Sequence, residues 1–173
     1  MLYVLAYPTF TPSQARSIDR FRARHEPERA RLVGPHVTLV FVLPSLDACA
    51  LCEATIRAVS GTAAIPVAFD RFVLEHDPFE NAHKIFLLAS TGGDALTALH
   101  RRLYHEAGQV PPGAAHVYRP HMTVATHPAR DALESLDASE IGGLPIRARV
   151  EAVDVVRVAD GQLETLMSVP LAT

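Results

Sequence analysis

Two histidines and two threonines occur at the same spacing in two short segments of the chain. Residues 35–39 and 120–124 both read Pro-His-x-Thr-aliphatic, as PHVTL and PHMTV. Successive side chains of a strand point to opposite faces, so each segment would present its His and Thr on one face and its aliphatic residues on the other. A pair of such strands could therefore bring two imidazoles and two hydroxyls together.

This set of groups is suited to acid–base chemistry at phosphorus. One neutral imidazole can take a proton from an attacking water, and the other, once protonated, can give a proton to the leaving oxygen. Threonine hydroxyls can donate hydrogen bonds to the non-bridging oxygens of a phosphate. A single His-x-Thr segment is more often structural, but its repetition favours function. We predict His36, Thr38, His121 and Thr123 as the catalytic residues.

The two segments belong to a larger repeat. Each half of the sequence reads strand–helix–strand–helix–strand, and equivalent landmarks lie about 81–85 residues apart, as His36 and His121 do. Strands are expected at about 2–7, 36–43, 65–74, 84–90, 121–126 and 144–158, with a final strand at 163–171 after an Asp160-Gly161 turn. Helices are expected at about 12–25, 45–60, 92–107 and 129–143.

This pattern predicts an α+β fold: two pseudo-symmetric lobes of antiparallel sheet, helices on the outer faces, and a central cleft carrying both His-x-Thr motifs. We expect one bilobal domain over residues 1–173, with lobes of about 1–80 and 81–173 and a polar connector at 75–83. His36 and His121 are expected on central, neighbouring strands.

Composition and charge exclude several classes of protein. The net charge of −3 argues against a general DNA-coating protein. No apolar stretch reaches 18 residues, and the opening MLYVLAYPTF lacks the charged start and cleavage site of a signal peptide, so we expect a cytoplasmic monomer without a membrane span. Six arginines in residues 16–31 indicate either a solvated helix face or a rim that attracts an anionic substrate.

No cofactor or metal is expected. Cys49 and Cys52 form a CxxC pair, but no second pair completes a zinc set, and reduced thiols on a helix are the simpler interpretation. His100 and His105 are five residues apart on an expected helix, which is the wrong spacing for a shared metal.

The chain resembles the 2H phosphoesterase superfamily, which includes bacterial 2′-5′ RNA ligase-like proteins and cyclic nucleotide phosphodiesterases. PHVTL and PHMTV carry the resemblance, which extends over nearly the whole chain. It implies His36 and His121 as the acid/base pair, Thr38 and Thr123 as phosphate-holding hydroxyls, and activity without metal on 2′,3′-cyclic phosphates or 2′-5′ linkages. Where many relatives carry an arginine shortly after the second motif, this chain has Thr126 and His127.

Arg119 is a further candidate. Alternation would place it on the face of His121, with Gly34 at the matching position of the first motif, so it could lend positive charge to a bound phosphate. The alternative is an ordinary surface arginine. Tyr118 is expected to pack on the opposite face.

We therefore expect a metal-independent phosphodiesterase that acts in RNA processing, on RNA ends or small cyclic nucleotides. Two alternatives stay open: a nucleotide-binding module that uses the same cleft without turnover, and a metal-dependent hydrolase.

Overall fold

Strands and helices alternate along the chain in the order that the repeat predicts. The computed structural model describes residues 1–41, 46–111 and 117–173. The strands are β1 (Leu2–Thr9), β2 (Val37–Val40), β3 (Ile65–Asp77), β4 (Ala82–Thr91), β5 (His121–His127), β6 (Ile146–Ala159) and β7 (Gln162–Pro170). The helices are α1 (Pro12–His25), α2 (Pro27–Leu32), α3 (Ala48–Val59), α4 (Gly93–Glu106), α5 (Arg130–Glu134) and the 3-10 helix η1 (Ala138–Ile141).

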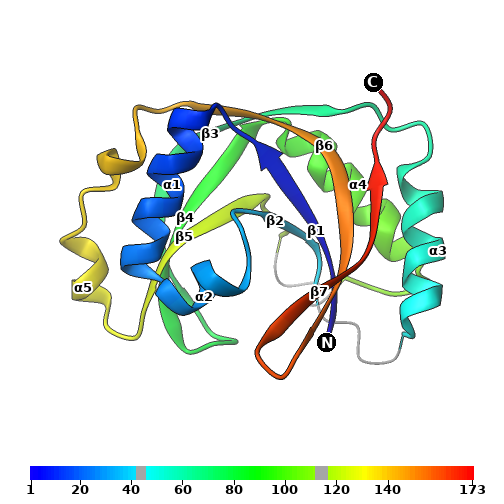
Figure 1. The fold of residues 1–173 in the computed structure, drawn as a ribbon, viewed down its shortest axis with the longest axis horizontal. Helices are drawn as coiled ribbons and strands as arrows, with labels where there is room; N and C mark the ends of the chain where they lie inside the picture. The colour runs from blue at the N-terminus through cyan, green and yellow to red at the C-terminus, as the bar shows by residue number, and fades with distance from the viewer. Residues whose placement is uncertain (42–45, 112–116) are drawn as a thin grey trace.

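The described strands form one antiparallel sheet. Its order is β2-β1-β6-β3-β4-β5, and β7 pairs with β6. This confirms the α+β class and its antiparallel sheet. The expectation of central strands for the motifs is wrong, because β2 and β5 stand at the two ends of the strand order. The sheet nevertheless brings these end strands into contact, side by side in the middle of the molecule (Figure 1).

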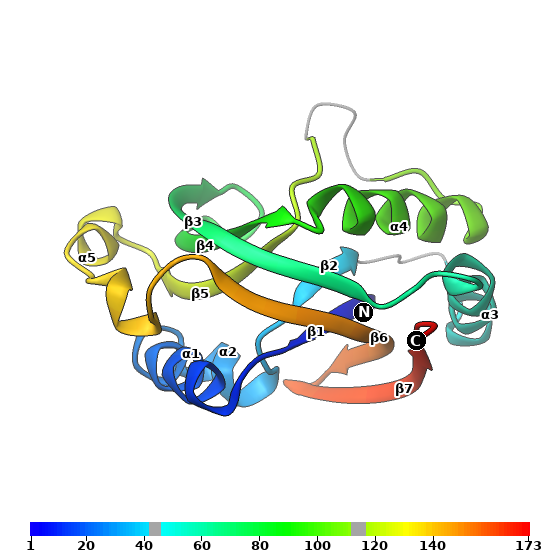
Figure 2. The ribbon, with the colours of Figure 1, turned by 90° about the horizontal axis from the view of Figure 1, so that it is seen from above.

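The two repeats exchange their third strands. β3, from the first repeat, pairs with β4 of the second, and β6, from the second repeat, pairs with β1 of the first. β3 and β6 also pair with each other, and Figure 2 shows them running alongside one another. The first helices are exchanged as well, since α1 packs on β5 and α4 packs on β2. Division of the chain into lobes at residues 80 and 81 stays a prediction.

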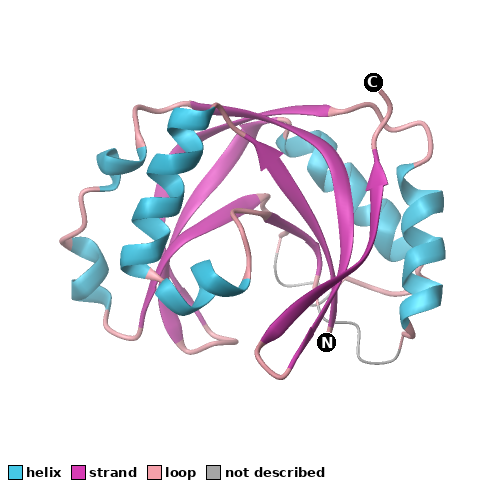
Figure 3. Cartoon of the chain, viewed as in Figure 1, coloured by secondary structure: helices cyan, strands magenta, loops and turns pink. Residues whose placement is uncertain are grey.

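Helices cover the outer sides of the strands, as predicted. α1, α2 and α5 lie on one side and α3 and α4 on the other, with the strands between them (Figure 3). Ile18 and Phe21 of α1 are buried in the main core together with Leu96, Leu99 and Leu103 of α4. Burial of these apolar faces is the main force that holds the helices on the strands.

Local sequence sets several boundaries. Asp160 and Gly161, with φ of 51° and 71°, form the tight turn predicted between β6 and β7. The connector predicted at 75–83 is mostly strand, because β3 continues to Asp77 and β4 begins at Ala82. The helix expected over 129–143 divides into α5 and η1, since the Asp137 side chain accepts a hydrogen bond from the Ser139 amide and starts a new turn.

Candidate functional site

Both His-x-Thr motifs show the predicted alternation. Val37 and Leu39 are buried in the core on β2, as are Met122 and Val124 on β5. The histidines and threonines that alternate with them are half-buried and point to the other face. The side-chain pattern of the strands therefore separates packing groups from chemically available groups.

The two imidazoles are held in the same way. Nδ1 of His36 donates to the Gly34 carbonyl at 2.8 Å, and Nδ1 of His121 donates to the Arg119 carbonyl at 2.7 Å. A carbonyl can only accept, so Nδ1 carries the hydrogen in each neutral ring and Nε2 carries the lone pair. Neither Nε2 has a hydrogen-bond partner among the described residues. Each ring therefore presents a proton acceptor at a fixed orientation.

The neighbouring strands supply an apolar floor beside the motifs. Leu5 of β1 lies opposite Thr38, and Phe86 of β4 lies opposite Thr123. The Phe86 ring contacts His121, with ring centroids 4.2 Å apart. Cross-strand partners share a face, so these apolar side chains flank the hydroxyls. In the described part of the chain, neither threonine hydroxyl forms a hydrogen bond, and both stay available as donors.

Burial favours the neutral form of both histidines. Burial is the largest cause that lowers the pKa of His36 to about 4; the charges of Arg22, Arg29 and His121 act in the same direction, and the Gly34 hydrogen bond opposes them. Burial also lowers the pKa of His121, with Arg119 and Lys84 acting in the same direction. The His121 ring is itself among the charges that lower the pKa of His36. Their ordinary pKa near neutrality, on which the sequence analysis relied, does not apply in this fold.

Arg119 has two contacts of different kinds. Its carbonyl anchors His121, as the Gly34 carbonyl anchors His36, so the predicted match between these two positions is present in the backbone. Its guanidinium forms an ion pair with Glu75 on β3 and is half exposed. Its role toward a substrate stays a prediction.

His100 and Tyr118 support β2 from the second repeat, which the sequence analysis missed. Nδ1 of His100 donates to the Leu39 carbonyl at 2.7 Å, and the Tyr118 hydroxyl donates to the Thr38 carbonyl at 2.9 Å. The two rings stack with centroids 3.8 Å apart and an angle of 2°. Both side chains thereby bind carbonyls of β2, which stands at the end of the described sheet and pairs there with β1. Nothing in the local sequence pattern indicates this contact, because the partners are more than 60 residues apart.

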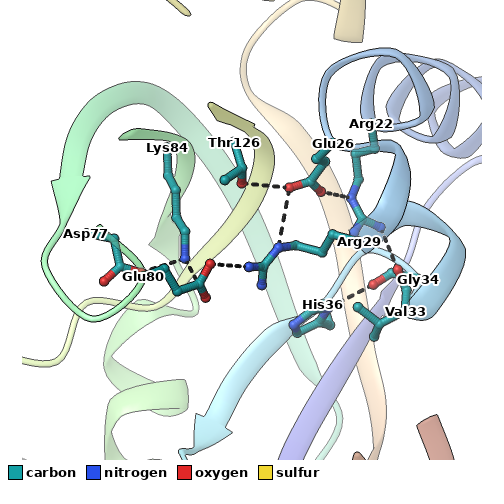
Figure 4. A network of polar contacts seen from close by, with 10 residues as sticks. All are labelled: Arg22, Glu26, Arg29, Val33, Gly34, His36, Asp77, Glu80, Lys84 and Thr126. Carbon is teal, nitrogen blue, oxygen red and sulfur yellow. Dashed lines mark hydrogen bonds and ion pairs between the residues drawn. The ribbon is translucent and has the colours of Figure 1, made fainter. Parts of the chain in front are cut away.

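A network of charged groups surrounds His36 on the side of α1 and α2 (Figure 4). Arg22 and Glu26 form a buried ion pair with Nε and Oε1 2.5 Å apart. Arg29 contacts Glu80 of the β3–β4 turn, and Glu80 also contacts the buried Lys84. The solvated helix face predicted for residues 16–31 is correct for the exposed arginines Arg16, Arg20, Arg24 and Arg31. It is wrong for Arg22, which lies four residues after Ile18 on the buried side of α1.

Other predicted features fall outside this site. Cys49 and Cys52 are free thiols on α3. Among the described residues, no group of three or more His, Cys, Asp or Glu side chains is arranged to hold a metal ion. No helix in the described ranges has the length and apolar character needed to cross a membrane. Two surface pockets lie along α1 and α2 rather than beside the motifs, so the central cleft stays a prediction.

Comparison with solved structures shows that the fold is shared. E. coli LigT complexed with 3′-AMP is 17% identical, with a TM-score of 0.64, 99% of this chain and 98% of that chain being covered. Kluyveromyces marxianus Usb1 is 12% identical, with a TM-score of 0.66 and coverage of 98% and 97%. TT0787 of Thermus thermophilus is 17% identical, with a TM-score of 0.60 and coverage of 97% of each chain.

Comparison of sequences gives the family. No curated protein matches the chain. The family model described as the 2′-5′ RNA ligase superfamily matches residues 10–162, a range that contains both motifs and most of the sheet. The chain therefore belongs to the 2′-5′ RNA ligase superfamily, the group of 2H phosphoesterases.

Proposed function

We propose that the chain is a metal-independent phosphodiesterase that acts on 2′,3′-cyclic phosphates or 2′-5′ linkages of RNA or nucleotides. Membership of the superfamily supports phosphodiesterase-type activity. The observation that carries the proposal is the matched pair of imidazoles, each anchored through Nδ1 and each two residues from a free threonine hydroxyl. His36 directly precedes β2 and His121 begins β5, and these two strands contact one another.

In the proposed reaction a phosphate lies between the two rings. Nε2 of one neutral histidine takes a proton from water as the water oxygen bonds to phosphorus. The bond from phosphorus to the leaving ribose oxygen breaks, and the other histidine, protonated at Nε2, gives that oxygen its proton. Thr38 and Thr123 donate hydrogen bonds to the non-bridging oxygens, where negative charge increases in the transition state.

The lowered pKa values of the histidines fit one half of this scheme directly. At neutral pH the free protein holds both rings in the neutral form, as a general base requires. The general acid must gain a proton, and an anionic phosphate beside an imidazole raises its pKa. Binding of the substrate thus prepares the acid. Arg119, once its guanidinium leaves Glu75, would add positive charge to the same phosphate.

The test is turnover of a panel of 2′,3′-cyclic mononucleotides and 2′-5′-linked dinucleotides by the purified protein. His36→Ala and His121→Ala should each lower kcat by about 10²–10⁴-fold, and Thr38→Val and Thr123→Val by less, because each removes a single donor. His105→Ala is the matched control, since that side chain is 86% exposed on α4. Near wild-type kcat in either motif-histidine variant would refute the assignment.

Two further results separate the alternatives. Activity that survives EDTA supports a reaction without metal, whereas its loss would indicate a metal-dependent hydrolase. Nucleotide binding that depends on His36 and His121 but is not followed by turnover would indicate a binding module instead.

A further inference from the structure

Glu26 is a buried carboxylate placed between the two motif-bearing parts of the molecule. It lies between α1 and α2 and is 4% exposed. Its Oε1 accepts from Nε of Arg22 at 2.5 Å, and its Oε2 accepts from the Thr126 hydroxyl at 3.1 Å. Burial raises the pKa of Glu26, and the charge of Arg22 opposes that effect. A buried ion pair of this kind is weak evidence for a stabilising role.

One chain of contacts runs from Glu26 through Arg22 to the segment that holds His36. The guanidinium of Arg22 is buried and bonds Glu26 through Nε, while another of its nitrogens donates to the Val33 carbonyl at 3.0 Å (Figure 4). The next residue, Gly34, provides the carbonyl that holds the His36 ring. A planar guanidinium with two fixed donors therefore holds the segment that orients this imidazole.

The other chain of contacts runs from Glu26 through Thr126 to the strand that carries His121. Thr126 lies on β5, the strand that begins at His121 and also carries Thr123. Its partner in the ladder is Lys84 of β4, which is buried and held by Asp77 and Glu80. The β4–β5 ladder shifts register once between Thr126 and His121, so the contact at Thr126 anchors the end of β5 opposite to His121.

We propose that Glu26 is a positioning residue that sets the spacing and orientation of His36 relative to His121, acting through Arg22 and Thr126. The proposal rests on the proposed function, in which both rings must reach one phosphate. A small misplacement of an acid or base lowers the rate of the chemical step more than it lowers binding. The effect of losing this link should therefore fall on kcat.

Two variants test the link at different points. Thr126→Val removes one hydroxyl and keeps the shape of the side chain, and Glu26→Gln removes the charge. With a 2′,3′-cyclic mononucleotide, each should lower kcat by about tenfold to a hundredfold with little change in KM. Glu134→Gln is the matched control, because Arg130 and Glu134 also form an i,i+4 pair, here exposed and on α5. If Glu26→Gln does not fold, Thr126→Val still tests the positioning role.

A readout that needs no turnover separates this proposal from the proposed function. Nitrogen-15 NMR of the histidine rings shows which ring nitrogen of His36 and of His121 carries the hydrogen. In the wild-type chain both rings should show Nδ1–H. Glu26→Gln should give a mixture of both forms at His36 and Thr126→Val a mixture at His121, whether or not the substrate panel contains the right compound. A folded Thr126→Val variant with unchanged kcat and an unchanged His121 spectrum would overturn the proposal. Absence of turnover in the wild-type chain would overturn the proposed function alone.

Discussion

Acidification should cost the wild-type chain more stability than it costs a His36→Gln variant. Burial, with help from Arg22 and Arg29, lowers the pKa of His36 from 6.5 to about 4. The unfolded chain binds the same proton near the ordinary pKa. Between these two values the unfolded state holds more protons than the folded state, so the free energy of unfolding falls as the pH falls.

The size of the effect follows from the size of the pKa change. One pKa unit corresponds to about 1.4 kcal/mol, so the step from 6.5 to about 4 sets an upper bound of about 3 kcal/mol. The His36 ring is half-buried, and water screens part of the interaction. We therefore expect His36 to account for a loss of about 1–3 kcal/mol between about pH 7 and about pH 4.

Urea unfolding across this pH interval measures the difference. The chain carries carboxylates that titrate in the same range, but they are common to all variants and cancel in the comparison. His105→Gln, with an exposed ring on α4, should follow the wild-type curve. If the wild-type and His36→Gln stabilities declined in parallel, the fold would not resist protonation of His36, and the electrostatic account of the site would be wrong.

Three further outcomes can be measured on the same protein. Gly92→Ala should be strongly destabilising in thermal unfolding, because φ is +76° and a Cβ would lie 2.4 Å from the Pro66 carbonyl oxygen; Gly61→Ala, with φ of +70° and open space, should cost only about 1 kcal/mol. Tyr118→Phe should lower stability by about 1 kcal/mol through loss of the bond to the Thr38 carbonyl. Dialysis against EDTA should leave both stability and turnover unchanged.

The motif geometry could be predicted because it depends on a local rule. A strand has a period of two, so the order His-Val-Thr-Leu already places His36 with Thr38 and Val37 with Leu39. The same holds for the second motif, and the burial of Met122 and Val124 agrees. The Asp160-Gly161 turn is local in the same sense.

The features that the sequence does not predict depend on contacts between distant parts of the chain. The Glu26–Thr126 bond spans 100 residues, and no local pattern predicts it. The lowered pKa of His36 depends first on its burial and then on the positions of Arg22 and Arg29, whose segment the sequence assigned either to a solvated helix face or to a rim for an anionic substrate. A helical spacing from Ile18 to Arg22 was the available signal that one arginine turns inward. The end positions of β2 and β5 follow from strand exchange, which a repeat in sequence does not reveal.

That exchange gives the chain a constraint on its folding during synthesis. Leu2 of β1 pairs with Arg157 of β6, so the first strand to be made waits for one of the last. The first repeat alone would leave β3 without β4 and β6, and β1 without β6, exposing strand edges that favour association with other chains. Closing such long loops slows folding. We therefore expect the two repeats to fold as one cooperative unit, and we expect neither repeat to fold on its own.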